Sequence, residues 1–262
     1  MHMNGEEGGG PASSRQPSRL QAWGQAVGGV FLAILIYVIF LLPNLSFRIG
    51  DSRISLPLVT WTHQALTHFA PPPLLREDAA WYLSQEIPGG LLLILCALLL
   101  LRAASTLTSR SIPFGSGGAE GLLWVIGIVA ASWGLFLVKD YLGSGRDTWE
   151  FPLPPCFGSA YYYMRATQYF AIFMIALFIS VFVKPFTEEV IFRGFLYNAC
   201  VPAWGLVAAA IVSSALFSLF HLLNGLDLFG YTNVFLGGLM FFAARVRFGG
   251  IGIPIAAHIA YD

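Results

Sequence analysis

Residues 30–42 of the chain read VFLAILIYVIFLL. They lie inside a stretch that has no charged residue between Arg19 and Arg48. A helix that crosses the roughly 30 Å hydrocarbon core of a bilayer needs about 20 largely apolar residues. We therefore expect the first membrane span here. A polar segment precedes it and no small-residue cleavage site follows it, which argues against a removable signal peptide.

More apolar stretches follow along the chain. The clearest, at residues 83–102, contains the run from Leu91 to Leu101. The others lie at residues 121–138, at 166–183, between Arg193 and Asp227, at 228–244 and at 248–261. The pattern predicts an all-α fold, a polytopic membrane helical bundle with about seven to eight transmembrane helices. The sequence leaves open whether residues 186–200 span the membrane, re-enter it or extend the fourth helix.

The composition agrees with a membrane protein. Of the 262 residues, 56% are hydrophobic and 11% are charged, whereas a soluble domain is roughly 25% charged. Fourteen Lys and Arg residues balance fourteen Asp and Glu residues. This excludes disorder and gives no basic surface for nucleic acid, so we expect membrane lipid as a partner and no nucleic acid. Three cysteines without CxxC spacing predict no disulfide framework.

We divide the chain into three regions. Residues 1–20 are a flexible polar N-terminal tail, residues 21–165 hold N-terminal transmembrane helices and loops, and residues 166–262 carry the polar motifs described below. A short interfacial helix is expected near Trp61 to Phe69. The aromatic cluster Tyr161 to Tyr163 indicates interfacial anchoring. The density of basic residues favours a cytoplasmic N-terminus.

Ionisable residues inside apolar spans are costly to bury and are functional hypotheses by default. Residues 184–194 read KPFTEEVIFRG. Pro185 and the two acids after it suggest a helix start, where acids suit the helix dipole. Glu189 and Arg193 share a helix face, while Glu188 points about 100° away. We expect one acid to pair with the arginine and the other to serve another role; the alternative is a capped interfacial helix with one salt bridge.

Two further pairs show the same four-residue spacing. Phe217 and His221 share one face, and so do His258 and Asp262. Each pair alone is compatible with a local hydrogen bond in a helix. Because burying these groups singly is expensive, we expect Glu188, His221, His258 and Asp262 to gather at one site.

Such a set suits the activation of water. A carboxylate can act as general base, and imidazoles can orient the water or stabilise an oxyanion. Alternatively Glu188, His221 and His258 form a Zn²⁺ set with an open fourth position. The zincin motif, the nucleophile elbow and the P-loop are absent from the sequence.

The run Pro185-x-x-Glu188-Glu189-x-x-Phe192-Arg193-Gly194 resembles the first signature of the CPBP family of intramembrane proteases, also called the CAAX prenyl protease 2 or Abi family. Phe217-x-x-x-His221 and His258-x-x-x-Asp262 resemble the other two signatures, in the same order and spacing. The resemblance covers residues 166–262 and implies an all-helical membrane fold that hydrolyses peptide bonds. Both a metallopeptidase and a metal-free glutamic mechanism are argued for this family.

The resemblance assigns roles to the site residues. Glu188 would activate water, and His221 would position it or bind a metal. His258 and Asp262 would stabilise the oxyanion or complete the ligand set, and Glu189, Arg193 and Phe217 would support the site. The chain ends on the last motif residue, and residues 251–262 make about 18 Å of helix. We therefore expect the natural protein to continue beyond Asp262.

The leading functional prediction is an intramembrane endopeptidase of the bacterial plasma membrane. Its substrate would be a membrane-associated protein or peptide: a CaaX-like tail, a bacteriocin-type peptide or a C-terminal sorting signal. The alternatives are a non-catalytic scaffold or bacteriocin-immunity protein of the same fold, and a proton-coupled transporter or channel.

Overall fold

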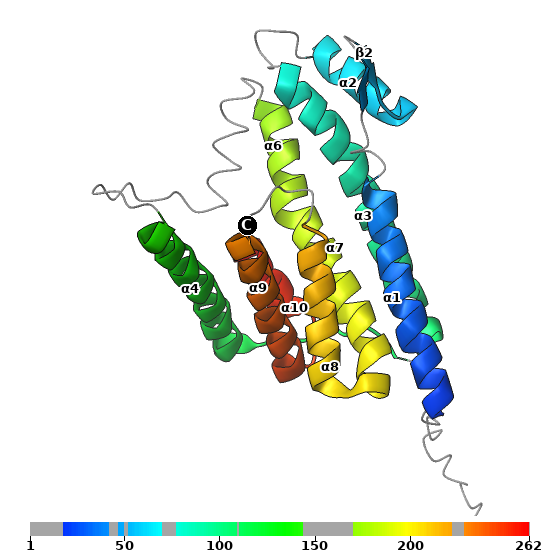
Figure 1. Cartoon of the computed structure of the whole chain (residues 1–262), viewed down its shortest axis with the longest axis vertical. Coiled ribbons are helices and arrows are strands. Elements are labelled where there is room, and N and C mark those ends of the chain that lie inside the picture. Colours follow the sequence, from blue (N-terminus) through cyan, green and yellow to red (C-terminus); the bar gives the residue numbers. More distant parts are fainter. Residues whose placement is uncertain are drawn as a thin grey trace, which may run out of the picture.

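The chain folds into a bundle of helices with one small β-hairpin (Figure 1). This computed structural model describes residues 18–41, 47–49, 52–69, 77–108, 110–143, 170–221 and 228–261. The first elements are α1 (Arg19–Leu41), β1 (Phe47–Ile49), β2 (Ser52–Ile54), α2 (Pro57–Phe69), α3 (Glu77–Thr108) and α4 (Gly118–Gly143). The remaining ones are α6 (Phe170–Phe178), η2 (Ile179–Val183), α7 (Lys184–Glu189), η3 (Val190–Leu196), α8 (Tyr197–Leu219), α9 (Leu228–Phe248) and α10 (Gly252–Tyr261).

The apolar helices confirm the prediction of an all-α membrane bundle. Among the described residues, four helical stretches are long and apolar enough to cross a membrane: Arg19–Ile39, Leu83–Thr108, Gly118–Leu135 and Met174–Leu219. The count of seven to eight spans is not confirmed by these four and stays a prediction. Helix α2 covers the segment expected to form a short interfacial helix, whereas the antiparallel β1–β2 hairpin was not anticipated.

Two other expectations fall largely outside the described residues. The description begins at Ser18, after most of the predicted polar tail, and the aromatic cluster Tyr161 to Tyr163 also lies outside it.

The helix that carries residues 184–194, called the motif helix from here on, does not begin at Pro185. The prediction of a helix start at this proline was wrong. Elements α6, η2, α7, η3 and α8 follow one another without a break, so residues 186–200 extend the preceding helix. The π-helical stretch η2 ends just before this proline, and the Lys184 N–H bonds to the Ile179 carbonyl five residues back. Such π turns interrupt the regular hydrogen-bond ladder, which accommodates a proline that has no N–H to donate. The run turns sharply at Gly205, whose φ of 77° favours glycine.

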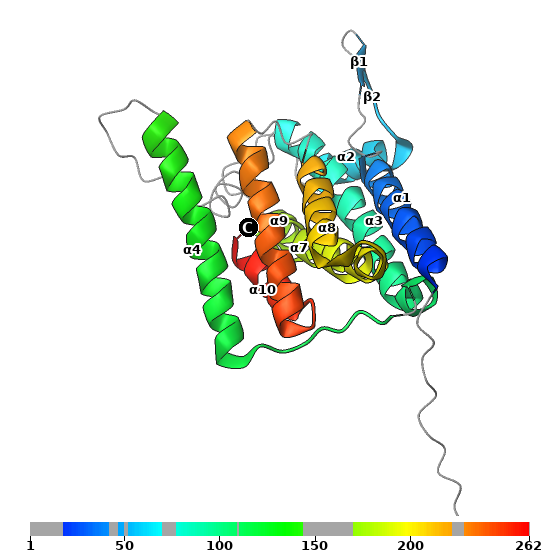
Figure 2. The same cartoon turned by 60° about the horizontal axis from the view of Figure 1, so that its bottom comes forward.

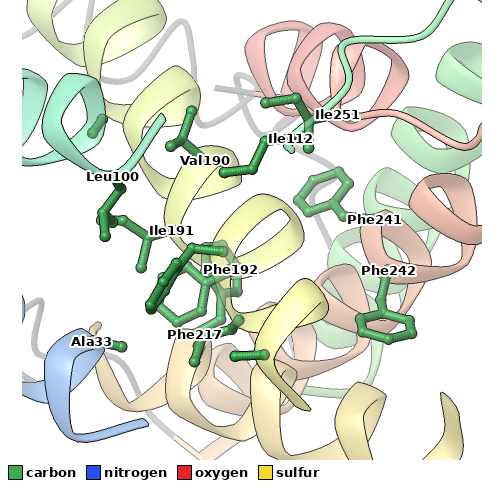
Figure 3. Packing of buried hydrophobic residues seen from close by; sticks show 14 of the residues in the cluster. Ala33, Leu100, Ile112, Val190, Ile191, Phe192, Phe217, Phe241, Phe242 and Ile251 are labelled. Atoms are coloured by element: carbon green, nitrogen blue, oxygen red, sulfur yellow. The ribbon is translucent and has the colours of Figure 1, made fainter. Parts of the chain in front are cut away.

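The motif helix occupies the middle of the bundle. Val190, Ile191 and Phe192 are fully buried, and η3 packs against α1, α3 and α8. Figure 3 shows Phe192 beside Phe217 of α8; their ring centroids are 5.3 Å apart in an edge-to-face arrangement. Because these apolar residues are buried, Glu189 and Arg193 on the same helix also lie in the core.

An extended segment, residues 110–117, connects the end of α3 to the start of α4 along one end of the bundle (Figure 2). The Ile251 N–H donates to the Pro113 carbonyl at 3.0 Å, and the Gly252 N–H donates to Phe114 at 2.6 Å. The Asn198 amide of α8 donates to the Ser111 carbonyl at 2.9 Å. These bonds fix the start of α10 relative to α8, and α10 carries His258.

Candidate active site

Glu189 and Arg193 form a fully buried ion pair. The Arg193 Nη1 donates to Glu189 Oε1 at 2.9 Å, and both side chains are 0% exposed. The pairing expected from their four-residue spacing is confirmed. An isolated charge in such a place is costly, so each of these groups depends on the other.

Arg193 has further partners from α8 and α9. Its Nη2 donates to the Gly238 carbonyl at 3.1 Å. Its guanidinium carbon lies 4.3 Å from the ring centroid of Phe217 and 5.2 Å from that of Phe241. Carbonyl oxygens and aromatic faces both attract a cation. The arginine thus ties the motif helix to the two neighbouring helices.

His258 connects the two adjacent acids of the motif. Its Nδ1 lies 3.0 Å from Glu189 Oε1, and its Nε2 lies 3.7 Å from Glu188 Oε2. Because Glu189 is the acceptor of the Arg193 guanidinium, the short contact to Nδ1 is best met by a proton on that nitrogen. The imidazole stacks on Phe241 with ring centroids 4.9 Å apart. The ring is therefore oriented by Glu189 and presents Nε2 towards Glu188.

The two acids, which the sequence predicts to have different roles, also differ in accessibility. The Glu188 side chain is 15% exposed, while that of Glu189 is fully buried. One turn earlier, Lys184 forms an ion pair with Glu86 of α3. The lysine charge is thus compensated from α3, and Glu188 is the more accessible carboxylate of the motif.

His221 lies directly after α8, and its ring nitrogens have distinct roles. The Nδ1 is 2.9 Å from the Phe217 carbonyl of the preceding turn. A carbonyl oxygen only accepts hydrogen bonds, so Nδ1 carries the proton. In the neutral imidazole the Nε2 lone pair is then available to accept a proton or a hydrogen bond.

A small cavity brings the two histidines together. Its volume is about 30 Å³, which is room for at least one water molecule. The cavity is lined by residues of α4, α8, α9 and α10 and by His221, which follows α8. These residues are Ser132, Phe217, His221, Asn233, Val234, Gly237, Phe241, His258 and Tyr261. Glu188 adjoins this cavity through its contact with His258.

Sequence reasoning missed three of the polar cavity residues, Ser132, Asn233 and Tyr261. Each is a polar side chain in an otherwise apolar helix. That is the signal which could have found them, since polar groups inside a membrane span need partners.

The structure assembles part of the predicted residue set. It brings together Glu188, Glu189, Arg193 and His258, and it places His221 and Phe217 on the adjoining cavity. Asp262 lies outside the described residues. Within the described part of the chain, no three His, Cys, Asp or Glu side chains lie close enough to hold a metal ion. Glu188, His221 and His258, the predicted Zn²⁺ set, therefore do not fit a three-ligand zinc site in this arrangement. The mechanism proposed for the protein uses no metal.

Apolar helices around a buried carboxylate–imidazole–carboxylate arrangement define an integral membrane protein with a hydrolase-like site. A comparison with protein families makes the assignment specific: residues 170–262 match the family model described as type II CAAX prenyl endopeptidase Rce1-like. The resemblance read from the three motifs is thus confirmed: the C-terminal part of the chain is similar to this family over residues 170–262. Comparisons with curated proteins and with solved structures gave no significant match.

Proposed function

We propose that the protein is an intramembrane endopeptidase in which Glu188 activates a water molecule. The observation that carries this proposal is the placement of His258 between two carboxylates of unequal burial. Glu189, fully buried, holds the imidazole, while Glu188, 15% exposed, faces its Nε2. A paired carboxylate that orients a histidine, beside a second accessible carboxylate, is an arrangement suited to general acid–base chemistry.

The hydrolysis proceeds in two steps. Water attacks the carbonyl carbon of the peptide bond, a C–O bond forms, and Glu188 takes the proton that the water releases. The His221 Nε2 accepts a hydrogen bond from the same water and orients it. The tetrahedral oxyanion is stabilised by hydrogen-bond donors, a role that His258 fills as an imidazolium with an Nε2–H and that Asp262 fills in its protonated form. The C–N bond then breaks, and the proton held by Glu188 passes to the leaving amine.

The substrate is proposed to be a membrane-associated protein or peptide, with the C-terminal tail of a prenylated or similarly anchored protein as the first candidate. The description of the matching family supports this class of substrate. Glu188, Glu189 and Arg193 lie within Met174–Leu219, a helical stretch long and apolar enough to cross a membrane. We place the protein in a bacterial plasma membrane with a cytoplasmic N-terminus and seven to eight spans, as the sequence predicts.

The test compares cells that express the wild type with cells that express Glu188→Gln. The amide keeps the shape of the side chain but cannot act as a base. Peptide C-termini of the membrane and secreted proteomes are identified by mass spectrometry. We expect new ends with the wild type only.

A matched control is Glu120→Gln, in which the same substitution falls on α4. Glu120 pairs with Arg247 at 2.8 Å on the surface, with both side chains at least half exposed. This variant should keep the wild-type set of ends. Identical proteomes for wild type and Glu188→Gln, with both proteins folded, would refute proteolysis and favour a scaffold or immunity role.

A further inference from the structure

The cavity beside the two histidines contains an amide that neither the motifs nor the proposed reaction uses. Asn233 of α9 lines this cavity and is 5% exposed. Its Nδ2 donates to the Tyr261 hydroxyl at 3.3 Å. Its Oδ1 is buried and has no hydrogen-bond partner among the described residues.

An unpartnered buried amide oxygen is costly and needs a partner that the described residues do not supply. Leaving such a group unsatisfied costs about 1–3 kcal/mol. Rotating the amide by 180° exchanges the two atoms: Oδ1 then faces the Tyr261 hydroxyl, and Nδ2 has no hydrogen-bond partner. The amide therefore calls for a small polar occupant in the cavity.

The size of the cavity decides which occupant fits. A volume of about 30 Å³ is enough to hold a water molecule. A buried water typically makes about three hydrogen bonds. The cavity offers the Asn233 amide together with the imidazoles of His221 and His258.

We infer that Asn233 is a positioning residue for the water consumed in peptide-bond hydrolysis. Rotated so that its Oδ1 accepts from the Tyr261 hydroxyl, the Asn233 amide donates through Nδ2 to the water oxygen. The two protons of this water are then left for the His221 Nε2 and for Glu188. The inference rests on the proposed function for the fate of the water, but the water site itself stands on the cavity and the unpartnered amide.

The first experiment needs no substrate. The structure of the full chain in lipid is determined at a resolution that shows ordered water, for the wild type and for Asn233→Leu. We expect a water hydrogen-bonded to both the Asn233 amide and a histidine nitrogen in the wild type, and its loss in the variant. A dry cavity, or a water that does not touch Asn233, would overturn the inference whatever the protein cleaves.

The second experiment measures kinetics on a synthetic peptide that spans a cleavage site found in the proteome comparison. Asn233→Leu should lower kcat by up to about 100-fold, because misplacing a reactant by about 1 Å can cost that much. KM should stay within twofold, because the peptide itself does not contact the amide.

The control is Thr232→Val, one residue away on the exposed side of α9, where the threonine hydroxyl bonds to the Leu228 carbonyl of its own helix. It should keep the wild-type kcat. A folded Asn233→Leu variant with wild-type kcat, or one altered in KM alone, would refute the positioning role. If the wild type cleaves no peptide, the proposed protease function is refuted. The first experiment, which looks for the ordered water, still tests whether Asn233 holds a water molecule.

Discussion

Replacing Glu189 by glutamine should destabilise the fold, whereas the same change at Glu188 should spare it. Glu189 Oε1 is the acceptor for Arg193 at 2.9 Å and for His258 at 3.0 Å, inside the core. Removing one partner of a buried ion pair costs about 3–5 kcal/mol, because the other charge stays buried without compensation. Arg193 keeps its bond to the Gly238 carbonyl, so we expect the lower value, about 3 kcal/mol.

This loss is a large part of a net stability of about 5–15 kcal/mol. For a chain of this size it corresponds to a fall in Tm of about 6–12 °C. Tm is measured in detergent by heating the protein and following the remaining folded fraction on a size-exclusion column. Glu188→Gln is the matched control, since its side chain is partly exposed and contacts His258 only at 3.7 Å; its Tm should stay within about 2 °C.

A double-mutant cycle with Arg193→Met makes the test stricter. If the pair is coupled, Glu189→Gln and Arg193→Met together should cost less than the two single losses added, by about 0.5–3 kcal/mol. Equal Tm values for Glu189→Gln and wild type, or strict additivity in the cycle, would show that the arginine charge does not depend on Glu189. The assignment of the two acids to different roles would then fail.

Further predictions concern the second histidine, the helix packing, the connecting segment and the metal question. His221→Gln should abolish cleavage while Tm stays within about 2 °C, because the ring is only partly buried and lies after the end of α8. Gly238→Ala should lower stability by about 1–3 kcal/mol, measured as Tm, because its Cβ would lie 2.9 Å from the Ser214 Cβ. Asn198→Ala removes the bonds to the carbonyls of residues 110 and 111, so limited proteolysis should cut that segment faster than in wild type. Dialysis against a chelator should leave the cleavage rate unchanged; a loss restored by Zn²⁺ alone would contradict the metal-free mechanism.

Much of the membrane bundle could be predicted because one physical requirement determines it. A helix in lipid must be apolar over a set length, and runs such as Val30 to Leu42 show this directly in the sequence. The pairing of Glu189 with Arg193 was also accessible, since it depends only on helix periodicity. In contrast, the uninterrupted helix through Pro185 depends on a π turn, and local propensity alone argues for a break there.

The contact of Glu189 with His258 was beyond sequence reasoning for a different reason. The two residues lie 69 positions apart, and their meeting depends on how α10 docks on the motif helix. That docking is fixed at a distance from the site by the backbone bonds from Ile251 and Gly252 to residues 113 and 114. Periodicity identifies which residues share one helix face, but the orientation of one helix against another is decided by such tertiary contacts.

Two neighbouring carboxylates thus acquire different chemistry from their surroundings alone. Glu189 accepts hydrogen bonds from Arg193 and His258 inside the core. Glu188 is more accessible and faces an imidazole whose other nitrogen is already engaged. If Glu189 were the base instead, each proton it took would weaken its bond to Arg193 and leave that charge uncompensated in the core. The buried acid is therefore suited to hold the histidine, and the more accessible Glu188 is left for acid–base chemistry.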